Sequence, residues 1–218
     1  MKRKHFLLLI MIVLFSSFSA LASNAEAKTA EIQERIEEER AEKQEALHSA
    51  IQEYIKSTTY YSREEKNGIQ SHKAFSAYIH SDFLGIQLRN HQNLSFLWQE
   101  ENRVWYIPIE EKEKTAGWIL GQEDEQSIVS YSYFHGGETG LTMEDVLNEI
   151  ENDSRINEPV RALRIIHDEC YMTWFAAFRT DDMEYIMPCS NTWEAAGLFK
   201  GEIYPASYFS LLLNRFLR

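Results

Sequence analysis

The segment SIVSYSYF at residues 127–134 has the two-residue alternation of a half-buried β-strand, because its valine and two tyrosines alternate with serines. The segment RVWYIPI at residues 103–109 is instead apolar at nearly every position, which is typical of a central strand covered on both faces. Pro108 has no backbone N–H to donate, so it is expected at an edge or a bend of the sheet. Strands of these two kinds predict a sheet with a buried interior.

Further strands are predicted on both sides of these two segments, where short runs are rich in aromatic and β-branched residues. Most of them follow one another without an intervening helix, which favours an antiparallel sheet over parallel βαβ winding. The predicted strands are Ala74–His80, Leu84–Arg89, Leu94–Gln99, Arg103–Ile109, Ser127–Phe134, Val160–Asp168, Tyr171–Phe178 and Glu184–Cys189.

Two helices are predicted within and after the strands. Thr142 is a good N-cap residue, Asp145 follows three residues later, and the apolar pattern predicts a helix over Met143–Asn152. The tail from Pro205 to Leu217 has apolar residues at helical spacing, and proline suits the first turn of a helix. The predicted fold class is therefore α+β, with a mainly antiparallel sheet and a C-terminal helix.

A charged N-terminal helix is predicted before the sheet. Residues 29–57 contain no glycine or proline, and good helix formers dominate. Apolar residues from Leu47 to Ile55 have helical spacing, so the second half is expected to pack on the domain while the first half projects into water. A coiled coil needs a sustained heptad, which fails over residues 37–45, so oligomerisation through residues 28–57 is not favoured.

An internal similarity links residues 94–121 to residues 174–201. An offset of 80 residues aligns four identities in 28 positions. Proline restricts the backbone conformations open to a residue, and glycine widens them. The same order of proline and glycine in the two segments therefore favours duplication. Two interpretations stay open, coincidence or two related β units. The identities are Pro108 with Pro188, Ala116 with Ala196, Gly117 with Gly197, and Gly121 with Gly201.

The N-terminus has the pattern of a secretory signal peptide. Three basic residues precede the apolar run Phe6–Phe15, and Ala20-Leu21-Ala22 is a small-x-small cleavage pattern. Cleavage is expected after Ala22, and the alternative is an uncleaved anchor of 17 residues from Phe6. The predicted organisation is a signal peptide at residues 1–22, a charged helical segment at residues 23–68 and an α+β domain at residues 69–218.

The charge balance of the chain limits the classes of molecule that it is expected to bind. Lysine and arginine number 22 against 34 acidic residues, which gives a formal net charge of −12. An acidic chain repels phosphate backbones, so nucleic acid is not an expected partner. No second long apolar segment follows Ala22, so the protein is expected to be secreted or extracytoplasmic, with no membrane attachment after signal cleavage.

Cys170 and Cys189 are the only cysteines. In an exported protein a disulfide between them is the favoured interpretation, and two buried thiols are the alternative. A four-residue loop between the strands would place Met172 opposite Cys189, so the pairing requires a shift of about two residues.

The sequence lacks recognised catalytic, metal-binding and cofactor-binding motifs, and no catalytic residue, metal ligand or cofactor is predicted. His167 lies three residues before Cys170, and strand alternation would place the two on opposite faces. The run His167-Asp168-Glu169-Cys170 lacks the spacing of a metal site. The acidic runs at residues 110–113 and 123–125 are interpreted as solvated loops.

Five tryptophans could supply a binding platform. Trp105 and Trp174 lie in runs that are apolar on both faces, which indicates a core position. Trp193 lies in a polar segment, so it is the tryptophan most expected to be exposed.

Three functions remain open, and the third of them is a structural role through association of the charged helix. The first is an exported, non-enzymatic binding or interaction module that engages a protein or peptide. The alternative is a small secreted hydrolase whose acid and base residues lie on separate loops.

Overall fold

The computed structural model describes residues 27–57, 68–80, 87, 95–111, 114–124, 127–135, 140–171 and 173–216. Within these ranges eight strands form one sheet, which is accompanied by four α-helices and three short 3₁₀ helices. The strands are β1 Phe75–His80, β2 Arg103–Glu111, β3 Lys114–Glu123, β4 Ile128–His135, β5 Ala162–Asp168, β6 Thr173–Arg179, β7 Glu184–Pro188 and β8 Tyr204–Pro205. The helices are α2 Ala30–Glu42, α3 Gln44–Ser57, α6 Met143–Asn152, α7 Ala206–Phe216, η1 Ser71–Lys73, η2 Ser95–Gln99 and η3 Asn191–Ala196.

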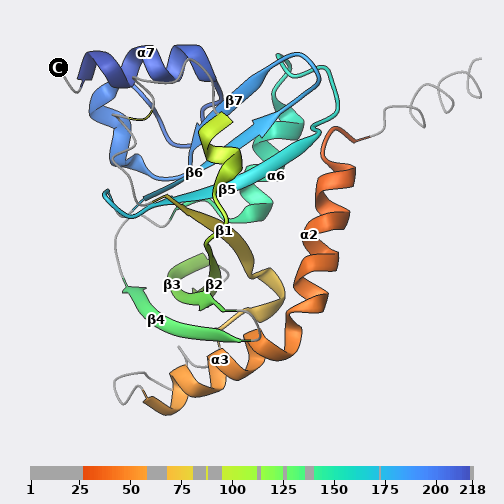
Figure 1. The fold of residues 1–218 in the computed structure, drawn as a ribbon, viewed down its shortest axis with the longest axis vertical. Helices are drawn as coiled ribbons and strands as arrows, with labels where there is room; N and C mark the ends of the chain where they lie inside the picture. The colour runs from red at the N-terminus through yellow and green to blue at the C-terminus, as the bar shows by residue number, and fades with distance from the viewer. Residues whose placement is uncertain are drawn as a thin grey trace, which may run out of the picture.

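The strand order is β4-β3-β2-β1-β5-β6-β7-β8 (Figure 1). Strands β1 and β5 are parallel, and every other neighbouring pair is antiparallel. The α+β class and the mainly antiparallel sheet are therefore confirmed. Strands β1 to β4 form an N-terminal half and β5 to β8 a C-terminal half. Among the described strands, the two halves are hydrogen-bonded to each other only where Tyr78–His80 pairs with Ile166–Asp168.

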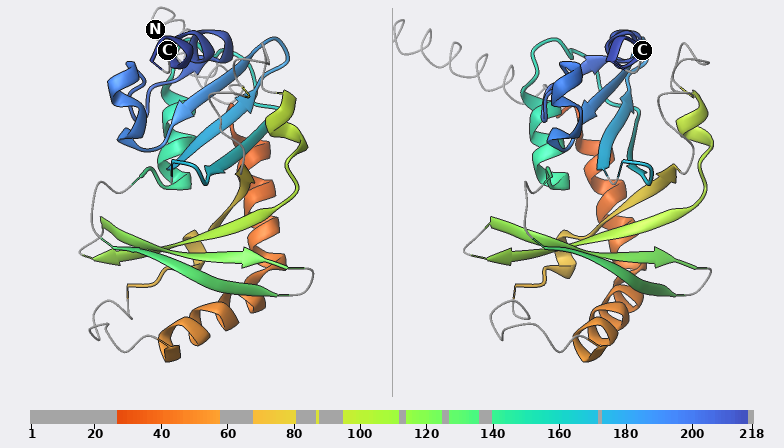
Figure 2. Two further views of the ribbon diagram at one scale, coloured as in Figure 1. Left: turned by 60° about the vertical axis from the view of Figure 1, so that its left-hand side comes forward. Right: turned by 90° about the vertical axis from the view of Figure 1, so that its left-hand side faces the viewer.

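Three buried clusters hold the helices on the sheet. Strand alternation sends Tyr106 and Trp174 to one face, Trp105 to the other face of the N-terminal half, and Phe175 to the other face of the C-terminal half. The shared core lies on the first face and joins both halves with α2 and α6. The α3 core and the α7 core lie on the opposite face, one on each half. Figures 1 and 2 show α2 running along both halves of the sheet.

Several predicted elements match the structure closely. The predicted helix Met143–Asn152 coincides with α6, and Thr142 caps it through a reciprocal bond with Asp145. Six predicted strands correspond to β1, β2, β4, β5, β6 and β7, and the C-terminal helix is α7. Pro108 lies within β2 opposite Trp118, and the register of β2 with β3 shifts just after it, between Ile109 and Glu110.

Two predictions about strands need correction. The expected strand Leu94–Gln99 is the 3₁₀ helix η2, which packs Leu97 into the α7 core instead of joining the ladder. Strand β3, which contains Gly117 and Gly121, is absent from the predicted strands. A Cβ at Gly121 would lie 2.4 Å from Ile128, so this glycine permits close strand contact. The expected strand Leu84–Arg89 lies outside the described residues except for Gln87.

The charged N-terminal segment is two helices, and its first half does not project freely into water. Helix α2 ends at Glu42 and α3 begins at Gln44. In α2, Ile32 is buried in the shared core and Ile36 packs against it, so both α2 and α3 pack on the sheet. Spaced isoleucines were enough to bury one side of a helix that is otherwise charged.

The proposed repeat matches in one strand only. At the offset of 80 residues β2 falls on β7, so Pro108 and Pro188 both lie in strands. However, η2 falls on β6, and β3 falls largely on η3 and the loop after it. The elements on either side of this strand therefore do not match between the two segments, and the duplication stays a prediction.

Candidate functional site

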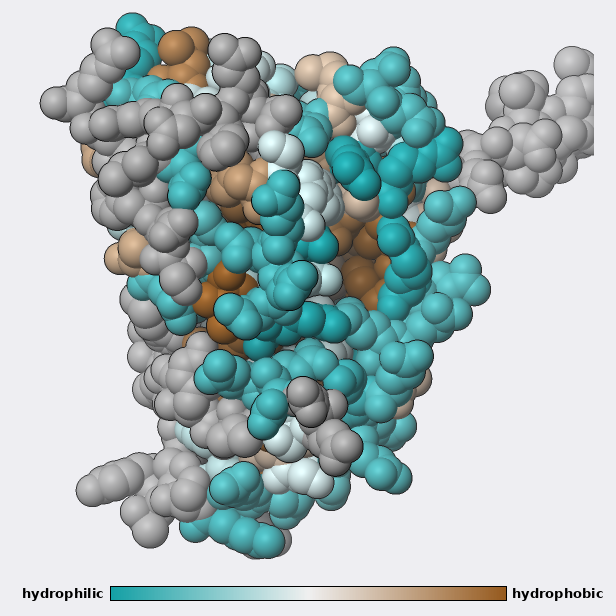
Figure 3. Space-filling model, viewed as in Figure 1, coloured by the Kyte–Doolittle hydropathy of each residue, from teal (hydrophilic) through white to brown (hydrophobic). Residues whose placement is uncertain are grey.

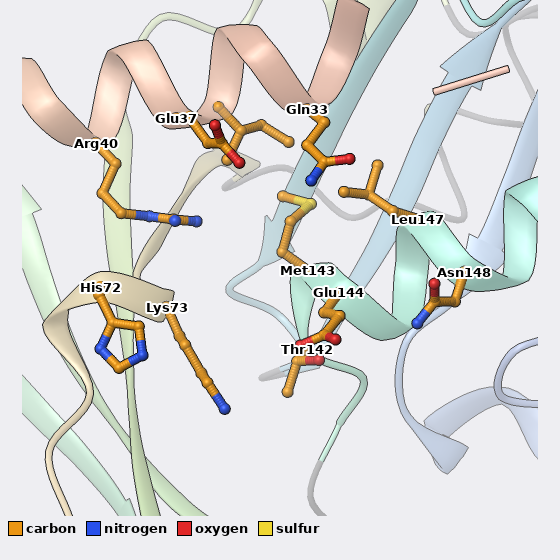
Figure 4. A pocket seen from close by; sticks show the side chains of 11 residues that line it. Gln33, Glu37, Arg40, His72, Lys73, Thr142, Met143, Glu144, Leu147 and Asn148 are labelled. Atoms are coloured by element: carbon orange, nitrogen blue, oxygen red, sulfur yellow. The ribbon is translucent and has the colours of Figure 1, made fainter. Parts of the chain in front are cut away.

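A cleft of 380 Å³ opens between α2, η1 and α6 (Figure 4). This size is within the range of small-ligand sites. A smaller hollow of 220 Å³ adjoins it and shares some of its lining. The cleft is lined by Gln33, Ile36, Glu37, Arg40, His72, Lys73, Thr142, Met143, Glu144, Leu147 and Asn148.

Local sequence fixes both helical walls of the cleft. The capping box at Thr142 starts α6, and the buried Val146 and Ile150 hold this helix on the shared core. On α2, Ile32 enters the same core. The remaining faces of the two helices are therefore set against each other across the cleft.

The floor of the cleft is apolar. Met143 is buried, and Ile36 and Leu147 are partly buried against the shared core. Apolar atoms from both helices thus face the opening, and they would contact an apolar group of a ligand.

Arg40 projects across the cleft from α2 (Figure 4). Its Nε donates a hydrogen bond of 2.8 Å to the carbonyl oxygen of Ala74, which directly follows η1. Burial lowers the pKa of the Arg40 guanidinium, and the nearby Glu37 carboxylate opposes that shift. The side chain remains cationic, because an arginine in a protein keeps its proton. Arg40 therefore supplies a fixed positive group inside the cleft.

His72 and Lys73 extend from η1 at the same end of the cleft as Arg40 (Figure 4). The Lys73 ammonium lies 2.6 Å from Glu110 Oε1, and this hydrogen bond raises the pKa of Lys73. The carboxylate of Glu144 also raises it, so Lys73 stays charged. The ion pair orients Lys73 and offsets its charge, so Arg40 is the main cation at this end of the cleft.

The other end of the cleft carries two amides. Gln33 of α2 and Asn148 of α6 lie there, away from His72 and Lys73 (Figure 4). An amide side chain both donates and accepts hydrogen bonds, as a peptide backbone does. The polar lining thus changes along the cleft from cationic groups to amides.

A second polar cluster lies at the carboxyl ends of the parallel strands. His80 Nδ1 lies 2.6 Å from Glu100 Oε1, and His80 is opposite Asp168 in the parallel register. Among the described residues His80 Nε2 and Asp168 Oδ2 have no hydrogen-bond partner. His80 is only 2% exposed and Asp168 is fully buried, whereas the Glu100 side chain is 27% exposed, so only the histidine and the aspartate are closed to solvent.

The same strand ends hold a buried pair on the opposite face. The Tyr106 hydroxyl forms a short hydrogen bond with His167 Nδ1. Burial lowers the pKa of His167, whereas burial raises the pKa of Asp168. Asp168 Oδ1 also accepts the backbone N–H of Tyr171, which stabilises the turn after β5. His167 is buried and bonded to Tyr106, and Asp168 is buried and bonded through Oδ1 to the turn, so we assign both residues to the packing of the strand ends.

The structure corrects the predicted disulfide, because it forms no bond between the sulfur atoms of Cys170 and Cys189. Strand register explains this outcome: Phe175 pairs with Pro188, which sets Trp174 opposite Cys189, and the Cys189 N–H donates to the Trp174 carbonyl. Cys170 lies four residues before Trp174 and is exposed, while Cys189 is buried in the shared core. Burial strongly raises the pKa of the Cys189 thiol, which makes it unreactive.

The structure also corrects the predictions for Trp193 and for parts of the two acidic runs. Trp193 is not exposed as expected: it is buried in the α7 core and packs edge-on against Tyr171 at 4.3 Å. Glu110 and Glu123 belong to strands and are paired with Lys73 and Lys43, so these parts of the acidic runs are not loops. The expected cleavage position after Ala22 lies outside the described residues.

Sequence reasoning missed every residue of the cleft as a site residue. Arg40 lies in a run of helix-forming charges, and Lys73 lies next to a predicted strand, so neither stands out locally. The only usable signal was Ile36, an apolar residue of the charged helix on the same side as Ile32. The meeting of α2, η1 and α6 requires the tertiary fold.

Comparisons with known protein families, curated proteins and solved structures gave no match. The helices in the described part of the chain include none with the length and apolar character needed to span a membrane.

Proposed function

We propose that this chain is an exported, non-enzymatic binding module whose cleft between α2, η1 and α6 receives a protein or peptide segment. The observation that carries this proposal is the combination of an apolar floor with polar groups on the rim. Export is supported by the signal-peptide pattern of residues 1–22.

The lining favours a peptide over a purely apolar ligand. Ile36, Met143 and Leu147 would contact an apolar side chain. The amides of Gln33 and Asn148 would exchange hydrogen bonds with peptide groups, which have the same donors and acceptors. A small number of polar groups around an apolar floor is typical of sites that orient a ligand.

Binding of a defined random pool of N-acetylated hexapeptides to the chain from residue 23 tests this proposal. We expect a subset of the pool to be retained and then to bind as purified peptides in calorimetry. Asn148→Trp would place a bulky ring at the cleft and should weaken binding at least about ten-fold, since it displaces ligand contacts.

Asn152→Trp is the matched control, because Asn152 is exposed on α6 one turn beyond the cleft lining. This variant should bind as the unchanged chain does. Equal loss in both variants, or no retained peptide, would contradict the proposal. Hydrolysis of the retained peptides would instead favour the secreted hydrolase.

A further inference from the structure

We infer that the cleft captures the free C-terminal end of a peptide, with the terminal carboxylate on Arg40 and an apolar last side chain on the floor. This inference rests on the proposed function and names the ligand class of the same site.

Arg40 is arranged to hold a carboxylate. Its Nε is already bonded to the Ala74 carbonyl oxygen, which fixes the plane of the guanidinium. The end of the group projects into the cleft (Figure 4). A planar guanidinium can donate two parallel hydrogen bonds to one carboxylate, and partial burial strengthens such a bond.

The neighbouring charges favour a single anionic group at this position. Lys73, which is paired with Glu110, lies beside Arg40 as a second cation, whereas Glu37 and Glu144 also line the cleft. These two carboxylates would repel a second negative charge on the ligand. A chain terminus with an uncharged, apolar last residue satisfies both conditions.

The apolar floor sets the nature of that last residue. Met143 and Leu147 of α6 face Ile36 of α2 in the same cleft. A terminal aliphatic side chain would bury its surface there while the carboxylate remains at the cationic end. The amides at the other end would then meet the preceding peptide groups.

A second groove on the other side of α2 provides a contrast. This groove of 350 Å³ has an apolar floor that includes Ile32 and Leu163, and its rim carries Glu38 and Glu42. Figure 3 shows hydrophobic residues within a hollow beside α2. Its only arginine, Arg35, donates to the carbonyl oxygen of Arg161 and thus stays on the rim. The acidic rim makes this groove unsuitable for a carboxylate.

The test compares N-acetyl-Gly-Ala-Leu as the free acid and as the C-terminal amide, with binding measured by calorimetry and NMR on the chain from residue 23. The acid should bind at least about ten-fold more tightly, since its carboxylate accepts charge-assisted hydrogen bonds from Arg40 that the amide cannot accept. In Arg40→Gln the preference for the acid should disappear. In Arg35→Gln, the control on the same helix, it should persist.

Equal binding of acid and amide would overturn this inference and leave the proposed function intact, because a peptide would still occupy the cleft. Absence of binding by the tripeptides and by the whole hexapeptide pool would instead overturn the proposed function. The acid and amide comparison uses the unchanged protein, so it does not depend on the folding of Arg40→Gln. Arg40→Lys, which keeps the charge but not the paired donors, should retain only part of the preference.

Discussion

The two faces of the sheet are covered in different ways. On one face α2 and α6 close a single shared core that takes residues from both halves of the sheet. On the other face each half has its own core, with α3 on the N-terminal half and α7 on the C-terminal half. Helices on one face thus join two halves that are built separately on the other.

The difference follows from the short contact between the halves. Strands β1 and β5 pair over Tyr78–His80 with Ile166–Asp168 only. On the divided face, Tyr78 lies between two guanidinium groups, with Arg103 at 5.6 Å and Arg164 at 4.0 Å from its ring. The contact of the two arginines with Tyr78 separates the α3 core from the α7 core. In the shared core, by contrast, aliphatic and aromatic side chains pack continuously from one half to the other.

Tyr106→Ala should be the most damaging change, because it empties the centre of the shared core. Tyr106 is fully buried and packs on Phe75, Trp118 and Trp174. We expect the free energy of unfolding to fall by about 3–5 kcal/mol. Urea denaturation and hydrogen exchange should show amides of both halves losing protection together. Loss confined to the N-terminal half would contradict the shared role of this core.

Leu47→Ala should destabilise one half selectively. Leu47 is 1% exposed in the α3 core, so its truncation should cost about 2–4 kcal/mol. Hydrogen exchange should accelerate in α3 and β2 more than in α7. Leu211→Ala is the control, because Leu211 is exposed on α7 and its change should stay within about 0.5 kcal/mol. Uniform acceleration in both halves would remove the distinction between the two faces.

Thr142→Ala tests the attachment of α6 to the shared face. The Thr142 hydroxyl accepts the backbone N–H of Asp145, and loss of such a cap costs about 1 kcal/mol. Chemical denaturation should detect this loss, while Thr142→Ser, which keeps the hydroxyl, should stay within about 0.5 kcal/mol of the unchanged protein. Equal losses in both variants would assign the effect to the methyl group.

The smallest predicted effect concerns pH at the seam between the halves. Burial lowers the pKa of His167 in the folded state. The unfolded chain therefore binds this proton first as the pH falls through about 6.5, and stability decreases on acidification. His167→Gln should show a weaker loss between pH 8 and pH 5.5 in thermal unfolding. An identical pH dependence in the two proteins would exclude His167 as its source.

Asp168 acts in the opposite direction. Burial raises its pKa, so the folded state takes up this proton first and stability falls as the pH rises through the raised value. The pH profile of His167→Gln should therefore keep an acidic component from Asp168.

Prediction from sequence succeeded where local pattern decides the structure. Thr142 and Asp145 form a cap from within one turn, so the start of α6 could be predicted. It failed at Gly121, since only the approach of Ile128 shows that this glycine belongs inside a strand. The candidate cleft was not predictable at all, because Arg40 and Met143 are about a hundred residues apart in the chain.

The sequence by itself determined the α+β class, most of the strands, the helices α6 and α7, and the acidic charge, because periodicity, capping and composition act over a few residues. The tertiary structure alone decided that α2 packs on the sheet, that Cys170 and Cys189 stay apart, and that one face has a shared core while the other has two. These features depend on strand register and on contacts between distant segments, which no local preference specifies.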